Sequence, residues 1–312
     1  MHITVLCLST SLQRTAIFDS LAINEVNRSN YFRLDASGKG LNTARVLQQL
    51  EKDCVTALAP IGKDNADIFL ELAKHDNLYI EPILLPGFTR ECVTLIDKST
   101  KNVTELVMDE PIFEQSIIDS HILPAEKELD EKLEKLFAKS NAFVFSGSRP
   151  KFWSKDLPSK ICKKALDRGL TVLVDFHGDD LRSVLETCTP TIIKINKQEF
   201  CTTFNIPFEL SQDELHAAIS EKSKALQNCI VVTQGTEPTL ASHNGENVVQ
   251  EAEIVEVVNT IGCGDSFNAG FIHEFVCTKN DTQKSDLTAA LAKGTWCASR
   301  NAESEKVGDV MN

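Results

Sequence analysis

The sequence lacks the long apolar run that a membrane-spanning helix needs, because no apolar stretch approaches about 18 residues. It also lacks a basic excess: 32 Lys and Arg residues stand against 45 Asp and Glu residues, which gives a formal net charge of −13. Nucleic acids and anionic membranes are bound by basic surfaces, so we expect neither as a partner. A small phosphorylated substrate is not excluded, since it needs only a local basic pocket.

The ten cysteines form no Cys-x-x-Cys pair and no Cys/His cluster at the spacing of zinc modules. The N-terminal residues do not have the pattern of a signal peptide, so we expect reduced thiols and a cytoplasmic location. With 312 residues, 42% of them hydrophobic and 25% charged, the composition is that of an ordinary globular protein. The length allows one large core with a small appendage.

Two familiar nucleotide-binding loops are also missing. No Lys-Ser or Lys-Thr follows the glycine-rich turn at 262–265, which excludes a Walker A loop there. The same turn lies near the C-terminus and lacks the third glycine of a dinucleotide-binding fingerprint. The sequence contains no internal repeat and no low-complexity segment.

The most informative segment that is present surrounds this turn. A β-branched run at 254–258 predicts a strand, and the apolar spacing after Asp265 predicts a helix that begins at the turn. Gly262 and Gly264 carry no side chain that would block close approach to the backbone. Unpaired N–H groups and the positive end of the helix dipole would favour an anion there. Asp265 could then deprotonate a hydroxyl beside a transferring phosphoryl group; the alternative is a turn that only caps a helix.

Along the chain, short apolar runs alternate with amphipathic stretches. The runs predict buried strands at 3–8, 55–62, 79–85, 142–146, 171–175, 192–196 and 229–233, with a hairpin at 240–251. The stretches predict helices at 41–50, 64–74, 126–139, 159–168, 181–188 and 214–227, one that opens at 197, and others from 265 to about 301. This alternation indicates one α/β domain over residues 1–312, with a mainly parallel central sheet covered by helices on both faces.

Two further stretches, at about 12–35 and 88–108, alternate between apolar and polar residues as half-buried strands do. The second stretch contains a polar turn at 98–102 and predicts a hairpin. Because both stretches have one wet face, we expect them to pair in a small β-sheet apart from the main one.

Polar or glycine-containing turns follow several strands of the predicted main sheet. They contain Gly147 and Ser148, Asp175, Lys194 and Asn196, Thr233 and Gly235, and the 262–265 turn. Ligands of parallel sheets bind at the C-terminal ends of the strands, so we expect these residues to converge on one crevice.

Lys39 lies in a second glycine turn, at the start of the helix predicted at 41–50. A cation at a helix N-terminus opposes the helix dipole, and a bound anion would resolve that conflict. The alternative is an exposed lysine on a turn.

Taken together, these segments resemble the ribokinase-like PfkB family of carbohydrate kinases, over about residues 2–303. The sequence at 259–271 matches the family signature N-T-x-G-x-G-D-x-F-x-A-G-F. Within the family it is most similar to the branch of 1-phosphofructokinase and tagatose-6-phosphate kinase. There, 33–42 matches R-x-D-x-G-G-K-G-x-N with Ser37 in place of the first glycine. Shorter matches are T-R at 89–90, S-G-S at 146–148 and K-x-N-x-x-E at 194–199.

The resemblance implies a role for each matching residue. Asp265 would be the base that deprotonates the sugar hydroxyl. The phosphoryl group would be held by the backbone N–H groups of Gly262, Cys263 and Gly264. The sugar phosphate would be bound by Gln13, Gly38, Lys39, Asn42 and Arg90. ATP would be bound by Lys194, Thr233, Gly235 and Asn301, and Mg²⁺ by Asn196 and Glu199 through water.

The resemblance also implies a lid, formed over the sugar by the half-buried strands. Lids in this family often pair between subunits, so a homodimer through the lid is one implied arrangement. Three departures affect the substrate and nucleotide sites. Gln13 replaces an aspartate, and an amide both donates and accepts hydrogen bonds, so sugar recognition is altered. Arg149 and Lys151 add two cations near the substrate end, and Pro238 interrupts a G-x-x-G pattern on the nucleotide side.

The resemblance favours an ATP-dependent kinase of a ketohexose phosphate, of the fructose 1-phosphate or tagatose 6-phosphate type. A second hypothesis is a kinase of the same fold for an unphosphorylated sugar or a nucleoside. Lys39 and Arg90 count against it, since an uncharged substrate would leave two cations unpaired. A third hypothesis is a non-catalytic sugar-phosphate-binding protein, against which the intact Asp265 counts. The sequence does not determine the sugar, the oligomeric state or the pathway.

Overall fold

A computed structural model of the protein describes residues 1–278 and 286–311 and contains a large central sheet. In that part of the chain, nine strands form the sheet in the order β13-β12-β11-β10-β9-β8-β1-β4-β5. Their bounds are β1 Ile3–Leu6, β4 Val55–Gly62, β5 Ile80–Leu85, β8 Ala142–Ser146, β9 Thr171–Asp175, β10 Ile192–Asn196, β11 Cys229–Gln234, β12 Glu237–His243 and β13 Glu246–Gln250. Neighbours pair in parallel except at β12 and β13, which are antiparallel. The predicted α/β class is confirmed.

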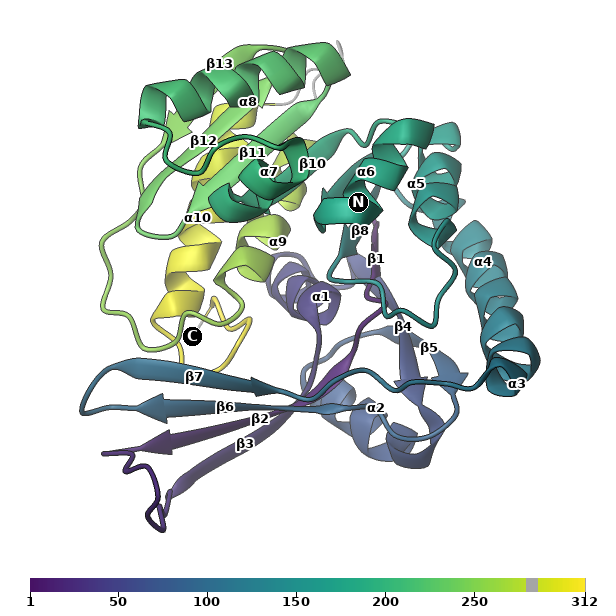
Figure 1. The fold of residues 1–312 in the computed structure, drawn as a ribbon, viewed down its shortest axis with the longest axis vertical. Helices are drawn as coiled ribbons and strands as arrows, with labels where there is room; N and C mark the ends of the chain where they lie inside the picture. Colours follow the sequence, from purple (N-terminus) through teal and green to yellow (C-terminus); the bar gives the residue numbers. More distant parts are fainter. Residues whose placement is uncertain (279–285, 312) are drawn as a thin grey trace.

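Helices cover both faces of this sheet (Figure 1). One face packs against α1 Lys39–Leu50, α2 Ala66–His75, α9 Cys263–Cys277 and α10 Leu287–Ala302. The other packs against α4 Leu123–Phe137, α5 Leu157–Asp167, α6 Gly178–Thr187, α7 Lys197–Phe204 and α8 Gln212–Leu226, with the short α3 Gln115–Ile117 ahead of α4. Within the described residues no helix is long and apolar enough to span a membrane.

The strands of the sheet are apolar throughout because both of their faces are covered. In β1, Ile3 and Val5 belong to one core cluster and Leu6 belongs to the other. In β8, Val144 joins the first cluster and Phe143 the second. Side chains of a strand alternate between faces, so a continuous apolar run is what a doubly covered parallel strand requires.

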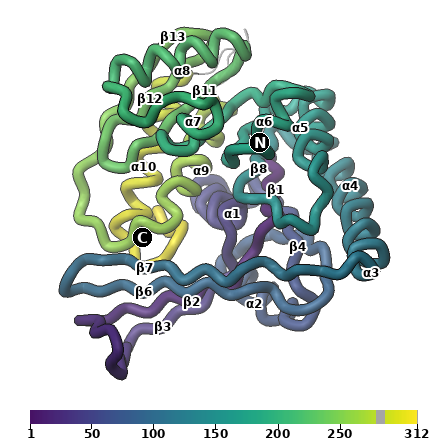
Figure 2. The backbone as a smooth tube through the Cα atoms, viewed as in Figure 1, coloured from purple at the N-terminus to yellow at the C-terminus, as the bar shows by residue number. Residues whose placement is uncertain are grey.

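A separate sheet of four strands, called the lid after its expected role, is set apart from the main sheet (Figure 1). Its strands are β2 Ser11–Phe18, β3 Tyr31–Ser37, β6 Glu91–Asp97 and β7 Asn102–Val107, in the order β3-β2-β6-β7. The β2/β3 and β6/β7 pairs run side by side although 53 residues, 38–90, separate them in the sequence (Figure 2). Because β2 pairs with β6 in parallel, from Leu12 opposite Glu91, the predicted pairing of the two half-buried stretches is confirmed.

The strand predicted at 254–258 is wrong, because residues 251–260 form a loop. Ile254 is fully exposed, and the β-branched run does not pair with β13, the last strand of the sheet on that side. The backbone N–H groups of Val258 and Asn259 instead donate to the carbonyl of Ala302, at 2.7 and 3.1 Å. A high β-propensity therefore does not make a strand here, since the hydrogen-bond partner is the end of a helix.

The two helices nearest the C-terminus, α9 and α10, approach each other closely at two glycines. A Cβ placed on Gly270 would lie 2.5 Å from the carbonyl oxygen of Lys293 and 2.7 Å from Cys297 Sγ. A Cβ on Gly294 would lie 3.0 Å from the Phe267 ring. Neither position can gain a methyl group without a shift of the facing helix or ring.

We therefore expect Gly270→Ala to destabilise the protein by about 1–3 kcal/mol through overpacking. In an exposed helix the same change would stabilise by about 1 kcal/mol, so the sign of the effect is diagnostic. Gly294→Ala should lower the free energy of unfolding by less, because the Phe267 ring that the new methyl group meets can move more easily than a backbone carbonyl. Urea unfolding of both variants measures this, and a Gly270→Ala protein more stable than the parent would contradict the close contact.

Candidate active site

A cleft of about 760 Å³ lies between the C-terminal ends of the main-sheet strands and the lid. Three sets of residues line it. The sheet contributes Gly147, Ser148, Asp175, Lys194, Asn196 and Thr233; the starts of α1 and α9 contribute Gly38, Lys39, Asn42, Gly262, Gly264 and Asp265; and the lid region contributes Gln13, Arg90, Cys92, Glu105 and Val107. The predicted convergence of the polar turns is confirmed for all of them except Gly235, which lies outside the lining, in the turn after β11.

The start of α9 faces this cleft with Gly262 and Gly264 in the lining, while the Cys263 N–H makes a long hydrogen bond of 3.4 Å to the Thr260 carbonyl. Gly262 is the N-cap with φ of 80°, and no side chain caps the helix. A Cβ at Gly262 would lie 2.3 Å from Val307 Cγ1, so both its conformation and its surroundings require glycine. The first turn of a helix has no internal acceptors for its N–H groups, and the dipole is positive there. The predicted turn and helix therefore provide an anion-binding end to the cleft.

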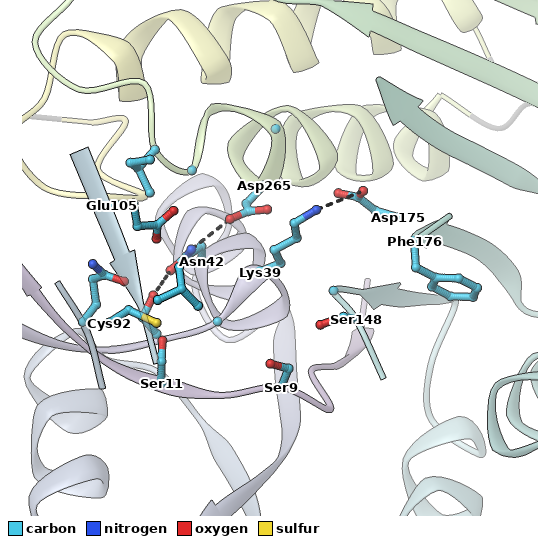
Figure 3. Close-up of a pocket in the computed structure, with 18 of the residues that line it drawn as sticks. Ser9, Ser11, Lys39, Asn42, Cys92, Glu105, Ser148, Asp175, Phe176 and Asp265 are labelled. Carbon is cyan, nitrogen blue, oxygen red and sulfur yellow. Dashed lines mark hydrogen bonds and ion pairs between the residues drawn. The ribbon is translucent and has the colours of Figure 1, made fainter. Parts of the chain in front are cut away.

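Asp265 lies in that first turn and is 6% exposed. Its Oδ2 accepts a hydrogen bond of 2.8 Å from Asn42 Nδ2, which comes from the first turn of α1 (Figure 3). Burial raises the pKa of the Asp265 carboxyl to about 6; the charge of Asp175 adds to the rise, while the Lys39 ammonium and the Asn42 hydrogen bond oppose it. A carboxylate with such a pKa is ionised at neutral pH and is still a useful proton acceptor.

Lys39 points across the cleft between two carboxylates, Asp265 and Asp175 (Figure 3). Its Nζ lies 3.9 Å from Asp175 Oδ1, and this carboxylate holds the pKa of Lys39 above its usual value. The unfavourable position of this cation at a helix N-terminus is thus offset by protein carboxylates, without any ligand.

Asp175 was expected in the crevice but was given no role there, yet it lies at the centre of this charge cluster. Its Oδ2 accepts from Asn268 Nδ2 at 2.5 Å and lies 3.4 Å from Lys194 Nζ. Burial alone would raise the pKa of Asp175, but Lys194, Lys39 and the Asn268 hydrogen bond bring it below the usual value. The available signal was a carboxylate at the C-terminal end of a buried parallel strand.

Arg90 reaches the cleft but is already bound to other groups. Its Nε lies 3.1 Å from Glu110 Oε1, its Nη1 donates to the Met108 carbonyl and its Nη2 donates to Ser9 Oγ. Ser9 in turn donates to the same Glu110 carboxylate. The expectation that an uncharged substrate would leave Lys39 and Arg90 unpaired is therefore wrong, because each has a carboxylate partner in the protein.

Two other predicted sugar-site residues lie in the lining with well-defined surroundings. Gln13 is 4% exposed, and its Nε2 donates to Thr94 Oγ1 at 2.8 Å, from β2 to β6. Gly38 has φ of 136°, and a Cβ there would lie 2.7 Å from both Cys7 Sγ and the Ser9 carbonyl. Gly38 is thus required so that α1 can begin against β1 and the turn that follows it.

The predicted Mg²⁺ residues, Asn196 and Glu199, form the N-terminal cap of α7. Asn196 Oδ1 accepts from the Glu199 N–H, and Glu199 Oε2 accepts from the Asn196 N–H, both at 2.9 Å. Both residues still line the cleft, and Glu199 Oε1 lies 3.7 Å from His177 Nε2. A donor set of amide and carboxylate oxygens, partly engaged in the cap, fits a hydrated Mg²⁺ rather than a directly ligated one.

The prediction for Asn301 needs correction, because its side chain does not reach the cleft. Asn301 is fully buried in α10, and its Nδ2 donates to the carbonyl of Ile261 at 2.8 Å. Its Oδ1 accepts from the Gly308 N–H at 2.7 Å and from Ser266 Oγ at 3.2 Å. Its polar atoms are engaged in holding the α9 turn in place. The Cys263 side chain likewise turns away from the cleft, with Asn301 Nδ2 3.3 Å from its Sγ, while its backbone stays in the turn.

Known proteins match this chain over nearly its whole length. A family model for pfkB family carbohydrate kinases matches residues 5–311. A structure of phosphofructokinase-2 from Escherichia coli in complex with fructose-6-phosphate is 18% identical, with a TM-score of 0.82, and covers 96% of this chain and 93% of that one. The tetrameric inhibited form of phosphofructokinase-2 from Escherichia coli is 19% identical, with a TM-score of 0.82, over 96% and 94%. A possible 1-phosphofructokinase from Thermotoga maritima is 18% identical, with a TM-score of 0.83, over 98% and 93%. These likenesses show the ribokinase-like fold.

The raised pKa of Asp265 predicts a stability cost that depends on pH. The folded protein binds this proton more tightly than the unfolded chain, so stability falls as pH rises from about 4 to about 6 and the whole cost is present above that. A pKa raised from 3.8 to about 6 corresponds to roughly 3 kcal/mol at most. We expect Asp265→Asn to be more stable than the parent at pH 8, with a smaller gain at pH 5, in urea unfolding.

The matched control is Asp175→Asn. Because the pKa of Asp175 is lowered rather than raised, its charge stabilises the fold, and this variant should lose stability at pH 8. Equal changes of stability in the two variants would contradict the opposite pKa shifts of the two carboxylates.

Proposed function

The chain belongs to the pfkB family of carbohydrate kinases and is a phosphotransferase that acts on a sugar hydroxyl; from this premise we propose that it uses ATP to phosphorylate a ketohexose phosphate, with Asp265 as the general base. The observation that supports this best is the position of Asp265. A buried carboxylate whose pKa is about 6 lies in the first turn of α9, beside the backbone amides of the glycine turn and in the lining of the cleft.

In the proposed reaction Asp265 accepts the proton of the attacking sugar hydroxyl. Asn42 occupies Oδ2, and no donor in the described residues is bonded to Oδ1, so Oδ1 is the oxygen that we assign to the proton transfer. The hydrogen bond from Asn42 fixes the carboxylate in one orientation, so the base needs no reorientation before it accepts the proton. At neutral pH the base is mainly ionised and ready.

The charge on the transferring phosphoryl group would be stabilised by the backbone N–H groups of Gly262, Cys263 and Gly264 and by Lys39. Phosphoryl transfer depends mostly on positioning and charge stabilisation, and a helix N-terminus supplies both without reorganisation. Lys39 lies between the base and Asp175, so it can follow the negative charge as it moves from nucleotide to sugar.

ATP would lie along the ends of β10 and β11, against Lys194 and Thr233. Asn196 and Glu199 would hold Mg²⁺ through water, and the bound ion would offset phosphate charge. The lid would cover the sugar, with Gln13 facing its hydroxyls.

A homodimer through the lid and a cytoplasmic location remain predictions. The exposed apolar side chain of Leu106, on the edge strand β7, supports the first of these.

A second candidate function is phosphorylation of an unphosphorylated sugar by the same site. The pairing of Arg90 with Glu110, and of Lys39 with Asp175, favours it, because neither cation needs a substrate phosphate as its counter-ion. The two candidates differ in whether Arg90 exchanges Glu110 for a phosphate when the substrate binds.

A substrate panel tests the proposed function. Purified protein with ATP and Mg²⁺ should form ADP with at least one of fructose 1-phosphate, tagatose 6-phosphate and fructose 6-phosphate, and less with fructose or tagatose. Asp265→Asn should lower kcat by about 10²–10⁴ and leave nucleotide binding intact. The kcat of the parent should fall about tenfold per pH unit below about pH 6, as the base becomes protonated. No ADP from any phosphorylated sugar would refute the proposal.

Arg90 and Glu110 provide the test of the substrate charge. If Arg90 binds the substrate phosphate, Arg90→Met should raise KM for the phosphorylated sugar by about 10–100-fold, the worth of one or two charged hydrogen bonds. Glu110→Gln should lower that KM, because it releases Arg90 from its partner. Arg14→Met is the matched control, since Arg14 pairs with Glu91 on the lid at 2.5 Å and does not line the cleft. If Arg90→Met changes the KM values of charged and uncharged sugars equally, the phosphate site lies elsewhere.

A further inference from the structure

Three side chains with metal-binding atoms meet at the end of α9 farthest from the cleft. They are Glu51, His273 and Cys277, and their ligand atoms all lie within 4.8 Å of one another. None of them lines the cleft. The described residues contain no other such group of three His, Cys, Asp or Glu side chains.

The helices explain why these side chains meet. His273 and Cys277 are four residues apart in α9, a spacing that places both on one face of a helix. Glu51 is the C-cap of α1, which packs against α9. Glu51 Oε2 lies 3.1 Å from His273 Nε2, so the acid and the imidazole are already in contact.

The electrostatic surroundings favour a cation at this point. Glu51 ends α1 and Cys277 ends α9, so the negative ends of two helix dipoles meet there. The opposing charge present is the amino group of Met1, 3.6 Å from Glu51 Oε1. Met1 also brings its thioether sulfur to 3.9 Å from Cys277 Sγ.

The histidine and the cysteine of this cluster differ in how far they are exposed to solvent. His273 is only 15% exposed, and its Nδ1 is buried without a hydrogen-bond partner in the described residues. Against the Glu51 carboxylate it is Nε2 that carries the proton, so a metal ion would replace that proton and bind between the imidazole and the carboxylate. Cys277 is the one exposed cysteine of the ten, so its thiol can be reached from solvent.

We propose that Glu51, His273 and Cys277 form a binding site for a zinc-type divalent cation, with water as a fourth ligand. Thiolate and imidazole ligands select zinc and its neighbours over magnesium, which takes oxygen ligands. The site would join the C-terminal ends of α1 and α9. The N-terminal ends of the same two helices carry Lys39 and Asp265, so the ion would fasten the pair of helices that builds the catalytic end of the cleft.

Co²⁺ tests the site, because a cobalt–thiolate bond gives an intense near-ultraviolet charge-transfer band. Full-length protein, reduced and freed of metal by a chelator, should bind one equivalent of Co²⁺ with that band, and Zn²⁺ should displace it. Cys277→Ser should abolish the band, and His273→Gln should weaken Co²⁺ binding at least about tenfold, the lower range for loss of a metal-site interaction. Cys188→Ser changes a partly exposed cysteine outside the cluster and is the control. It should keep both the charge-transfer band and the Co²⁺ affinity of the parent.

The melting temperature gives a second test of the site, because an ion that binds only the folded chain raises the melting temperature. Zn²⁺ should raise the melting temperature of the parent and of Cys188→Ser, and not that of Cys277→Ser. The proposal is overturned if the parent shows no thiolate band, or if the band survives in Cys277→Ser. It is also overturned if Cys54→Ser, at a buried neighbouring thiol, is the variant that removes the band. None of these outcomes depends on kinase activity, so they stand apart from the proposed function.

Discussion

The hydrogen bond between Asn42 and Asp265 joins the two helices on which the site depends. Asn42 has only one orientation that satisfies its neighbours. Its Nδ2 donates to Asp265, while its Oδ1 accepts from Ser37 Oγ and from Arg45 Nη1, each at 3.0 Å. Arg45, which is 2% exposed, donates its Nε to Asp76 at 2.8 Å. A buried guanidinium must be paired, so this row of contacts fixes the amide and, through it, the carboxylate.

These contacts explain why the carboxylate of the proposed base can be buried. An isolated buried charge would be neutralised by a proton, and the pKa of Asp265 has moved in that direction, to about 6. The shift stops there because Lys39 and the Asn42 amide favour the ionised form. The balance leaves a carboxylate that is charged at neutral pH and poorly solvated, which is the condition that the proposed proton acceptance needs.

The parts that the sequence predicts well are those governed by local periodicity. Strands covered on both faces must be apolar throughout, and helix faces repeat every three or four residues, so β1, β8, β9, β10 and β11 and the helices between them could be located. The Asp265 turn was recognisable because glycines and a helix start are adjacent in the sequence. By contrast, the segment at 251–260 has the β-propensity of a strand but forms a loop. Its backbone hydrogen bonds go to Ala302, a partner about 44 residues away in the sequence.

Partners across irregular segments escape such reasoning for the same reason. Glu110 lies in a segment without helix or strand, and no pattern indicates that it will pair with Arg90. Asn301 matched a nucleotide-site position in the family, yet the helix that carries it directs the side chain under the turn at Ile261. Asp175 did have a signal, the end of a parallel strand, but its importance comes from Lys39, Lys194 and Asn268, which only the fold brings together.

The charges that line the cleft limit how it can bind two phosphorylated ligands. Among the described lining residues, three cationic side chains, Lys39, Arg90 and Lys194, face five carboxylates, of Glu105, Asp175, Asp180, Glu199 and Asp265. All three cations also have a carboxylate within 4 Å. Side-chain charge alone therefore does not attract a nucleotide and a sugar phosphate together. In the proposed kinase the remaining sources of positive potential would be the backbone amides at the start of α9 and a hydrated Mg²⁺ near Asn196 and Glu199, so the glycine turn and the ion would have to act together.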